Sequence, residues 1–186
     1  LDIDLRTGAW QQREYWRPEY RPDPTLRAED LIGPLYEAMK DSVRRNLISD
    51  APVGITFSGG FDTSCILALA REMCPAEEIH TYSVVMEEAS FDESRWQHLM
   101  VDPKKHPHHE IRVGPRQVED ALLQHMAFLD EPTGDGAAIP FFLLAKEASK
   151  DVRVLLSGEG GDETFNAYET HLANKVRRLY RGYVPG

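Results

Sequence analysis

The sequence predicts an α/β domain built on a parallel, doubly wound sheet with helices on both faces. Short apolar segments alternate with segments of ten to fifteen residues that have helical periodicity, a pattern typical of right-handed βαβ units. Two of the predicted strands run directly into glycine-rich turns, at 58–60 and 157–161. The chain has 186 residues, of which 41% are hydrophobic, and this is enough for the core of about one domain.

The predicted elements follow from periodicity and from residues that start or stop helices. Pro34 suits the first turn of a helix, and Ser90 suits the cap of another. The helix that begins near residue 116 should turn Val118, Leu122, Met126 and Leu129 inward. In chain order we expect an extended segment or short hairpin over 1–24, a helix over 33–48, a strand over 53–57, a helix after the first glycine turn, a strand over 79–86, a helix over 91–101, a strand over 109–113, helices over 116–129 and 139–150, a strand over 152–156 and a helix over 162–180.

The ends of the chain and its net charge suggest how the domain is organised and which partners are disfavoured. Residues 1–30 are expected to be a connector from a missing N-terminal domain. Residues 31–186 are expected to be the folded domain, truncated at its C-terminus. A net charge of −10 argues against a nucleic-acid partner and against an anionic membrane surface. No apolar run approaches the length of a membrane span, so we expect a cytoplasmic protein; a homodimer is one assembly that the sequence leaves open.

The stretch from Pro52 to Ala70 has the pattern of a phosphate-binding loop. A buried strand ends at Ser58-Gly59-Gly60 and a helix follows. Glycines let the backbone approach an oxyanion, and the helix amides point toward it. Hydroxyl groups add further donors, and Asp62 could hold a cation beside the phosphate. The alternative interpretation is an ordinary strand-to-helix turn with a Ser/Thr cap.

A second glycine turn, Ser157 to Glu163, follows the last predicted strand and carries three carboxylates, Glu159, Asp162 and Glu163. These acids could simply cap the next helix. Ligands of parallel sheets bind outside the carboxyl ends of the strands, where both turns are expected to lie. Together the turns suggest phosphates at the first and Mg2+ held between phosphate oxygens and carboxylates of both.

Several motifs together resemble one known family. The first turn, Ser-Gly-Gly-x-Asp-Thr-Ser, is similar to the pyrophosphate loop (PP-loop) of the N-type ATP pyrophosphatases, which have an adenine nucleotide alpha hydrolase-like fold. With that turn, the order of the motifs resembles the synthetase domain of glutamine-dependent asparagine synthetases over nearly the whole chain. The motifs are Ser-Gly-Gly-Phe-Asp-Thr-Ser (58–64), Phe-Asp-Glu-Ser (91–94), His-His-Glu (108–110), Leu-Asp-Glu-Pro (129–132), Ala-Ala-Ile-Pro (137–140) and Leu-Ser-Gly-Glu-Gly-Gly-Asp-Glu (156–163).

The resemblance implies an ATP-dependent amide ligase that forms AMP and pyrophosphate. The carboxylate of a small molecule, most simply aspartate, would be adenylated and then amidated by ammonia, which a glutaminase domain or subunit could release from glutamine. Asp62 and Asp162 would hold Mg2+, Glu159 would face the acyl substrate or the ammonia, and these three carboxylates are the expected catalytic residues. The implied ATP and pyrophosphate site comprises Thr56, Phe57, Ser58, Gly59, Gly60, Asp62, Thr63, Ser64, Val84, Ser157 and Gly158.

Departures from the family pattern leave the acyl substrate open. Thr63 replaces a usual serine but keeps the hydroxyl, whereas the segments 163–168 and 133–134 differ where the substrate is expected. Within the class of AMP-forming amide ligases, the alternative is an enzyme that adenylates another carboxylate, as β-lactam synthetases, lasso-peptide cyclases and sugar-acid amidotransferases do. A truncated module that binds nucleotide without turnover is the alternative outside the class, because a later helical region that carries a catalytic lysine in the family does not follow.

A histidine-rich stretch, His106 to Glu110, has the residue types of a metal site. Adjacent residues of a strand point to opposite faces, so His108 and His109 should not share a metal ion. We therefore do not expect a metal there.

Overall fold

The computed structural model describes residues 1–19, 21–75, 78–102, 107–165 and 167–180. His106, the first residue of the histidine-rich stretch, lies outside these described residues. The chain divides into two units, Leu1–Ala38 and Met39–Gly186. In the described part of the chain, no helix is both long enough and apolar enough to cross a membrane.

The first unit combines both of the conformations expected for it. Strands β1 (Asp2–Ile3) and β2 (Trp10–Gln11) pair antiparallel, and an exposed extended segment follows them. Helix α1 (Ala28–Asn46) begins in this unit and ends in the second. It begins five residues earlier than predicted, and Pro34 lies inside the helix rather than in its first turn.

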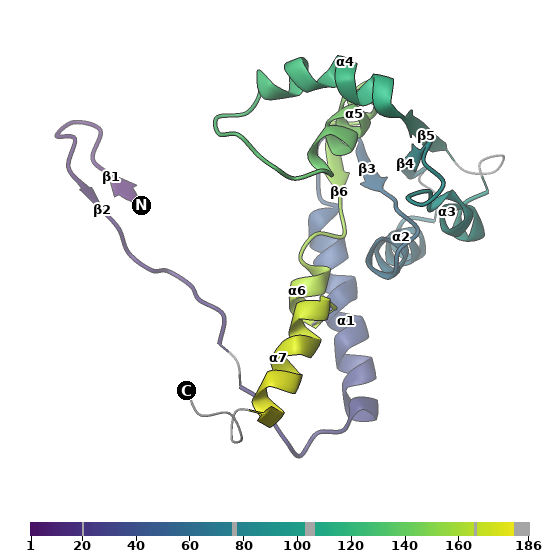
Figure 1. Ribbon diagram of the computed structural model, residues 1–186. Coiled ribbons are helices and arrows are strands. Elements are labelled where there is room, and N and C mark those ends of the chain that lie inside the picture. The colour runs from purple at the N-terminus through teal and green to yellow at the C-terminus, as the bar shows by residue number, and fades with distance from the viewer. Residues whose placement is uncertain (20, 76–77, 103–106, 166, 181–186) are drawn as a thin grey trace. The chain divides into compact units, whose positions relative to one another are not determined.

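The second unit contains a parallel sheet of four described strands in the order β5-β4-β3-β6, as predicted (Figure 1). The chain moves outward from β3 to β4 to β5 and then returns to the other side of β3 as β6. The strand order therefore reverses between β3 and β6, which is where ligands bind in open α/β sheets. The elements are β3 (Val53–Thr56), α2 (Phe61–Met73), β4 (His80–Met86), α3 (Ser94–Met100), β5 (His108–Val113), α4 (Pro115–Met126), α5 (Ala138–Ala148), β6 (Val154–Leu156), α6 (Gly161–Phe165) and α7 (Glu169–Tyr180).

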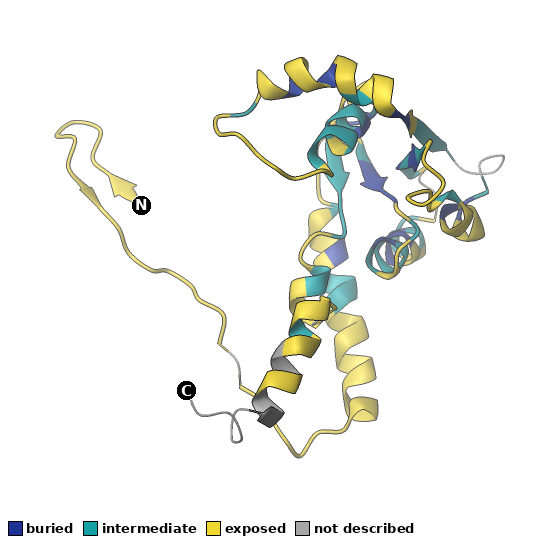
Figure 2. Ribbon diagram, in the orientation of Figure 1, coloured by how far each residue is buried: buried dark blue, intermediate teal, exposed yellow. Residues whose placement is uncertain are grey.

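Helices cover both faces of the sheet. On one face, Val43 of α1 and Leu67 and Ala70 of α2 pack around Ile55 of β3. On the other face, Leu144 and Ala148 of α5 pack with Tyr82 of β4. Figure 2 shows the buried residues concentrated in β3, β4 and the inner sides of these helices. The predicted doubly wound architecture is confirmed.

Helix α4 buries only part of the face that was predicted to turn inward. Leu122 and Met126 are 43% and 58% exposed, whereas Ala121 and His125 are buried. His125 contacts the ring of Phe142 of α5 edge-on at a centroid distance of 5.4 Å. The prediction was wrong for Leu122 and Met126, whereas Val118 and Leu129 are half-buried. The contact of His125 with Phe142 is between two helices, so hydrophobic spacing within one helix does not show it.

Two further boundaries differ from the prediction. Helix α3 begins at Ser94 rather than Phe91, because the Asp92 carboxylate accepts a hydrogen bond from the backbone N–H of Ser94 at 2.9 Å. Ser90 is therefore not the cap of this helix. The predicted final helix is two helices, α6 and α7, with Asn166 outside the described residues.

Candidate nucleotide-binding site

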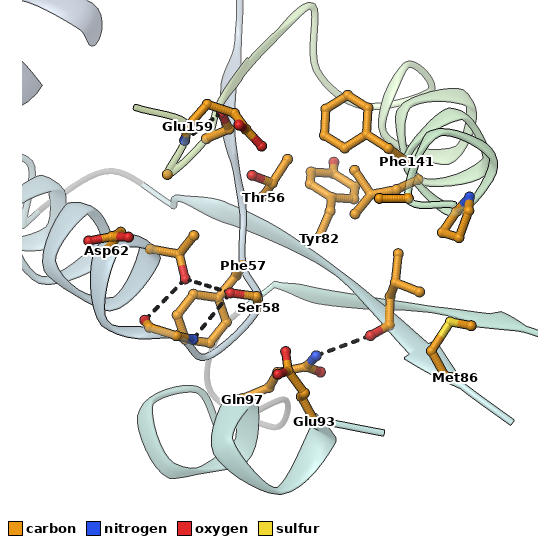
Figure 3. A pocket seen from close by; sticks show the side chains of 18 of the residues that line it. Thr56, Phe57, Ser58, Asp62, Tyr82, Met86, Glu93, Gln97, Phe141 and Glu159 are labelled. Carbon is orange, nitrogen blue, oxygen red and sulfur yellow. Dashed lines mark hydrogen bonds between the residues drawn. The ribbon is translucent and has the colours of Figure 1, made fainter. Parts of the chain in front are cut away.

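The first glycine loop begins where β3 ends. The buried Phe57 fixes its start: the backbone N–H of Phe57 donates to the carbonyl of Tyr82 at 2.7 Å, and the Ser83 hydroxyl donates to the carbonyl of Phe57. The Ser58 hydroxyl oxygen then accepts from the N–H of Gly60 at 3.1 Å and lies 3.2 Å from the Thr63 hydroxyl. Thr63 in turn donates to the carbonyl of Gly60 at 3.3 Å. These hydrogen bonds close the loop on itself (Figure 3).

Gly59 has the strictest backbone requirement in this loop. Its φ of +81° lies in the left-handed region that favours glycine. A Cβ at this position would lie 2.7 Å from the backbone nitrogen of Gln97 and 2.8 Å from the backbone carbon of Trp96. The loop therefore rests directly on the backbone of α3, and only glycine fits between them.

Helix α2 begins after this loop with its N-terminal amides open to an anion. The cap residue is Gly60, which has no side chain that could accept a hydrogen bond from the first amides of the helix. The first amides of a helix have no intrahelical acceptor, so they are available to a bound anion and carry the positive end of the helix dipole. A phosphate at this point would supply the missing acceptors.

Cys65, in the first turns of α2, is not suited to nucleophilic chemistry. Burial, with a smaller contribution from the Asp62 carboxylate, raises the pKa of its thiol. The thiol therefore stays neutral, which agrees with the passive role of a small apolar residue.

The second glycine loop lies directly against the first. A Cβ on Gly158 would lie 3.2 Å from Cβ of Asp62 and 3.1 Å from the Thr63 methyl group. A Cβ on Gly161 would lie 2.6 Å from the carboxylate carbon of Asp62. The two glycines thus leave the space in which the Asp62 carboxylate lies. Parallel pairing of β3 with β6 produces this contact, since it brings the carboxyl ends of both strands together.

Negative charge gathers on the second loop. Tyr168 donates a hydrogen bond to Glu163 at 2.8 Å. This bond, then burial, and then the charges of Glu163, Asp162 and Glu159 raise the pKa of Tyr168 to about 12. Carboxylate oxygens are the ligands that Mg2+ prefers. Asp62 lies against Gly161, the residue directly before Asp162.

Both loops open into one cavity of about 400 Å3 at the end of the sheet (Figure 3). This volume suits a small organic ligand. The predicted residues that line it are Thr56, Phe57, Ser58, Gly60, Asp62, Thr63, Val84, Ser157, Gly158 and Glu159. Gly59, Ser64 and Asp162 do not contribute to its lining, although Gly59 and Asp162 belong to the two loops.

Other cavity residues were missed by the sequence analysis. Gln97 of α3 is 1% exposed, and its side-chain nitrogen donates to the carbonyl of Val84 at 3.1 Å. Its side-chain oxygen is buried and has no hydrogen-bond partner among the described residues. Burying a polar acceptor without a donor is costly. The remaining lining residues are Phe61, Tyr82, Met86, Phe91, Glu93, Ala137, Pro140, Phe141 and Leu144.

The geometry agrees with the comparisons to known proteins. The family model for asparagine synthase matches residues 34–185. The chain belongs to the asparagine synthase family. It is 37% identical to the putative asparagine synthetase [glutamine-hydrolyzing] 2 of Methanocaldococcus jannaschii, over 92% of this chain and 33% of the relative. It is 34% identical to asparagine synthetase [glutamine-hydrolyzing] 1 of Bacillus subtilis, over 86% of this chain and 25% of the relative. The chain thus spans between a quarter and a third of the length of these two relatives.

A solved structure is also similar to part of the chain. It is a glutamine-dependent NAD+ synthetase from Acinetobacter baumannii in complex with ADP, with a TM-score of 0.48 and 18% sequence identity over 80% of this chain and 29% of that chain.

Proposed function

We propose that this domain binds ATP with Mg2+ and adenylates the side-chain carboxylate of aspartate, which ammonia then converts to the amide of asparagine. One observation carries the proposal: an anion-binding loop and an acid-bearing loop touch at Asp62 and Gly161 and open into a single cavity. Membership of the asparagine synthase family and the printed names of the relatives support aspartate as the substrate.

The first loop would hold the β- and γ-phosphates, which leave as pyrophosphate. Gly59 and Gly60 allow the backbone to come close, while the Ser58, Thr63 and Ser64 hydroxyls and the amides of α2 supply donors. The hydrogen bonds within the loop already hold its backbone in place, while the Ser58 and Thr63 hydroxyls would exchange their acceptors inside the loop for phosphate oxygens.

The adenine would lie at the other end of the cavity. Phe57, Val84 and Met86 provide apolar surface there, and Gln97 provides an unpartnered acceptor. The exocyclic amine of adenine is a donor of the kind that the Gln97 oxygen lacks, whereas guanine presents a carbonyl at that position. Ser157 and Gly158 would contact the nucleoside from the second loop.

Asp62 and Asp162 would hold Mg2+, which would neutralise charge on the phosphates. Glu159 lines the cavity from the second loop and would face the acyl substrate or the incoming ammonia. The residues of α5 that line the cavity, among them Phe141, would enclose the acyl side.

The reaction needs orientation more than covalent catalysis. A carboxylate oxygen attacks the α-phosphorus of ATP, and the bond to the β-phosphate oxygen breaks, so that its electron pair leaves with pyrophosphate. The nitrogen of ammonia then attacks the acyl carbon, the bond to AMP breaks, and the nitrogen loses a proton to solvent. Donors that stabilise the leaving pyrophosphate and exclude water would account for most of the rate.

The ammonia source is proposed to be a glutaminase domain or subunit, because the relatives' printed names describe glutamine-hydrolysing enzymes. The cytoplasm remains the expected compartment and a homodimer the assembly left open. A different carboxylate substrate remains the alternative within the class, since the segment 163–168 departs from the family pattern.

Pyrophosphate release tests the proposal with the protein at its full natural length. Release from ATP in the presence of Mg2+, aspartate and ammonia is expected, with asparagine as the product. Release with another acid but not with aspartate would assign the alternative substrate class. Mg2+-dependent ATP binding without release for any acid would instead indicate a nucleotide-binding module, and the absence of ATP binding would contradict the site itself.

A further inference from the structure

A second cluster of chemically active side chains lies beside α3, away from the lining of the nucleotide cavity. His98 of α3 and His108 and Glu110 of β5 each offer one ligand atom, and these three atoms lie within 4.8 Å of one another. Nε2 of His98 is hydrogen-bonded to Oε1 of Glu110, and Nε2 of His108 lies 3.9 Å from the same oxygen. His108 and Glu110 are two residues apart on one strand, so their side chains share a face.

His108 is the unusual member of this cluster. Its side chain is 0% exposed, and its Nε2 atom has no hydrogen-bond partner in the described part of the chain. Buried polar atoms in folded proteins are almost always paired. An orphaned ring nitrogen that faces a carboxylate oxygen therefore indicates that a cation belongs between them.

The surroundings of His108 also set which ring nitrogen carries the proton. Its Nδ1 atom lies 2.9 Å from the Thr81 hydroxyl oxygen, which itself lies 3.3 Å from the carbonyl oxygen of Pro107. The hydroxyl has one hydrogen, and the carbonyl can only accept. When Thr81 donates to Pro107, it accepts from Nδ1–H of His108, and Nε2 is left with a free lone pair. A metal-bound histidine is commonly held in this way, with its other ring N–H donated to a neighbouring oxygen.

We propose that His98 Nε2, His108 Nε2 and Glu110 Oε1 bind a divalent transition-metal ion, with Zn2+ the best match. Two imidazoles and one carboxylate form a common zinc ligand set. Tetrahedral bonds of about 2.0–2.1 Å would place the ligand atoms about 3.3–3.4 Å apart. The hydrogen-bonded atoms of His98 and Glu110 would therefore move apart, and Nε2 of His108 would move closer to Glu110. His98 is 46% exposed, which leaves a fourth position on the solvent side for water.

The other oxygen of Glu110 remains free for a different contact. Nη2 of Arg112 lies 3.9 Å from Oε2 of Glu110, whereas the histidines face Oε1. Binding of the ion would therefore not require the guanidinium to move away from the carboxylate oxygen that it faces.

The neighbouring strand residue provides a contrast. His109 belongs to a separate group with His80 and Asp151, as the alternation along a strand predicts. There His109 Nε2 lies 3.1 Å from Nδ1 of His80, and Tyr82 donates to Asp151 at 3.2 Å. The difference between the two groups is the His108 Nε2 atom: the first group contains this buried atom without a partner, and no atom of the second group is of that kind among the described residues.

The ion would fix α3 against β5. The residue before His98 is Gln97, whose backbone nitrogen lies beneath Gly59 of the first loop. The metal would thus be structural and would support the surface on which the phosphate loop rests. This role does not depend on which carboxylate the domain activates.

Titration of the metal-stripped chain with Co2+ and Zn2+ tests the proposal, because tetrahedral Co2+ gives intense visible bands. We expect one ion per chain, a rise in the melting temperature with Zn2+, and a loss of affinity of at least tenfold in H98A and in E110Q. Both substituted side chains reach the surface, so these variants should fold. H109Q is the matched control and should bind as the original chain does.

Three outcomes would overturn the proposal. They are the absence of stoichiometric binding at micromolar metal, undiminished binding in both H98A and E110Q, and an equal loss of binding in H109Q. Because none of these readouts involves ATP or pyrophosphate, a failure here is distinct from a failure of the proposed ligase activity.

Discussion

The two glycine loops look alike in sequence but are built differently. Each follows a strand, β3 or β6, and leads into a helix, and each contains a glycine with positive φ, +81° at Gly59 and +89° at Gly160. Gly59 is pressed against the backbone of α3, whereas a Cβ on Gly160 would meet no described atom within 4 Å. The first loop is a closed cradle with fixed donors. The second is an open loop that contributes charge, and its space is limited only where Gly158 and Gly161 face the first loop.

The largest effect is expected from alanine at Gly59, with alanine at Gly160 as the matched control. Both changes force a side chain into the left-handed region, which costs about 1–2 kcal/mol of stability. In G59A the new Cβ also overlaps the backbone of α3, and rotation of a side chain cannot relieve this overlap. We expect G59A to lower ATP affinity at least a hundredfold, and G160A to change it less than about threefold. Calorimetric titration and urea unfolding would measure these effects, and equal losses would contradict the contrast between the loops.

The next largest effect is expected at Asp162, and its neighbour Glu163 provides the comparison. Asp162 is proposed to hold Mg2+, whereas Glu163 accepts a hydrogen bond from Tyr168 at 2.8 Å. D162N should reduce Mg2+-dependent pyrophosphate release about a hundredfold, because a metal ligand loses its charge. E163Q should reduce it less than about fivefold. Similar losses in the two variants would remove Asp162 from its proposed role.

A smaller effect is expected where the loops touch. The Cβ of G161A would lie 2.6 Å from the carboxylate carbon of Asp62, which must rotate away. Because a flexible side chain can give way, stability should change by less than about 1 kcal/mol, while the Mg2+ concentration needed for ATP binding should rise about tenfold. G134A, whose Cβ would meet no described atom within 4 Å, is the control. An unchanged Mg2+ requirement in G161A would mean that Asp62 does not hold the ion.

The smallest effect concerns base recognition by Gln97. Q97M keeps a similar volume but removes the acceptor proposed for the adenine amine. We expect ATP affinity to fall about tenfold, equivalent to about 1.4 kcal/mol, and the preference for ATP over GTP to narrow. The free energy of unfolding should change by less than about 1 kcal/mol, since the variant loses one buried orphan oxygen and creates another at the carbonyl of Val84. A competition titration with both nucleotides measures the preference, and an unchanged ratio would place the base elsewhere.

The sequence was sufficient for features that depend on local pattern. The order of strands and helices, the parallel sheet and the position of both loops at strand ends follow from periodicity and from glycines beside short apolar runs. Ten of the residues that the family resemblance implied line one cavity.

Features that depend on contacts between distant elements could not be predicted. Helix α3 turns Gln97 inward while the larger Leu99 is exposed, because Gln97 bonds the carbonyl of Val84 on β4. The grouping of the histidines depends on such a contact as well. The correct separation of His108 from His109 gave no sign that His98, ten residues earlier, completes a group with His108 and Glu110.

Exchange of labelled pyrophosphate into ATP is the most direct measurement of the central claim, that the two loops form one site that cleaves ATP between its α- and β-phosphates. The exchange requires a reversible adenylate and needs no ammonia. With the protein at its full natural length, we predict exchange that depends on both Mg2+ and a carboxylate, fastest with aspartate, and that is lost in D62N. Tight Mg2+-dependent ATP binding without exchange for any carboxylate would contradict the account.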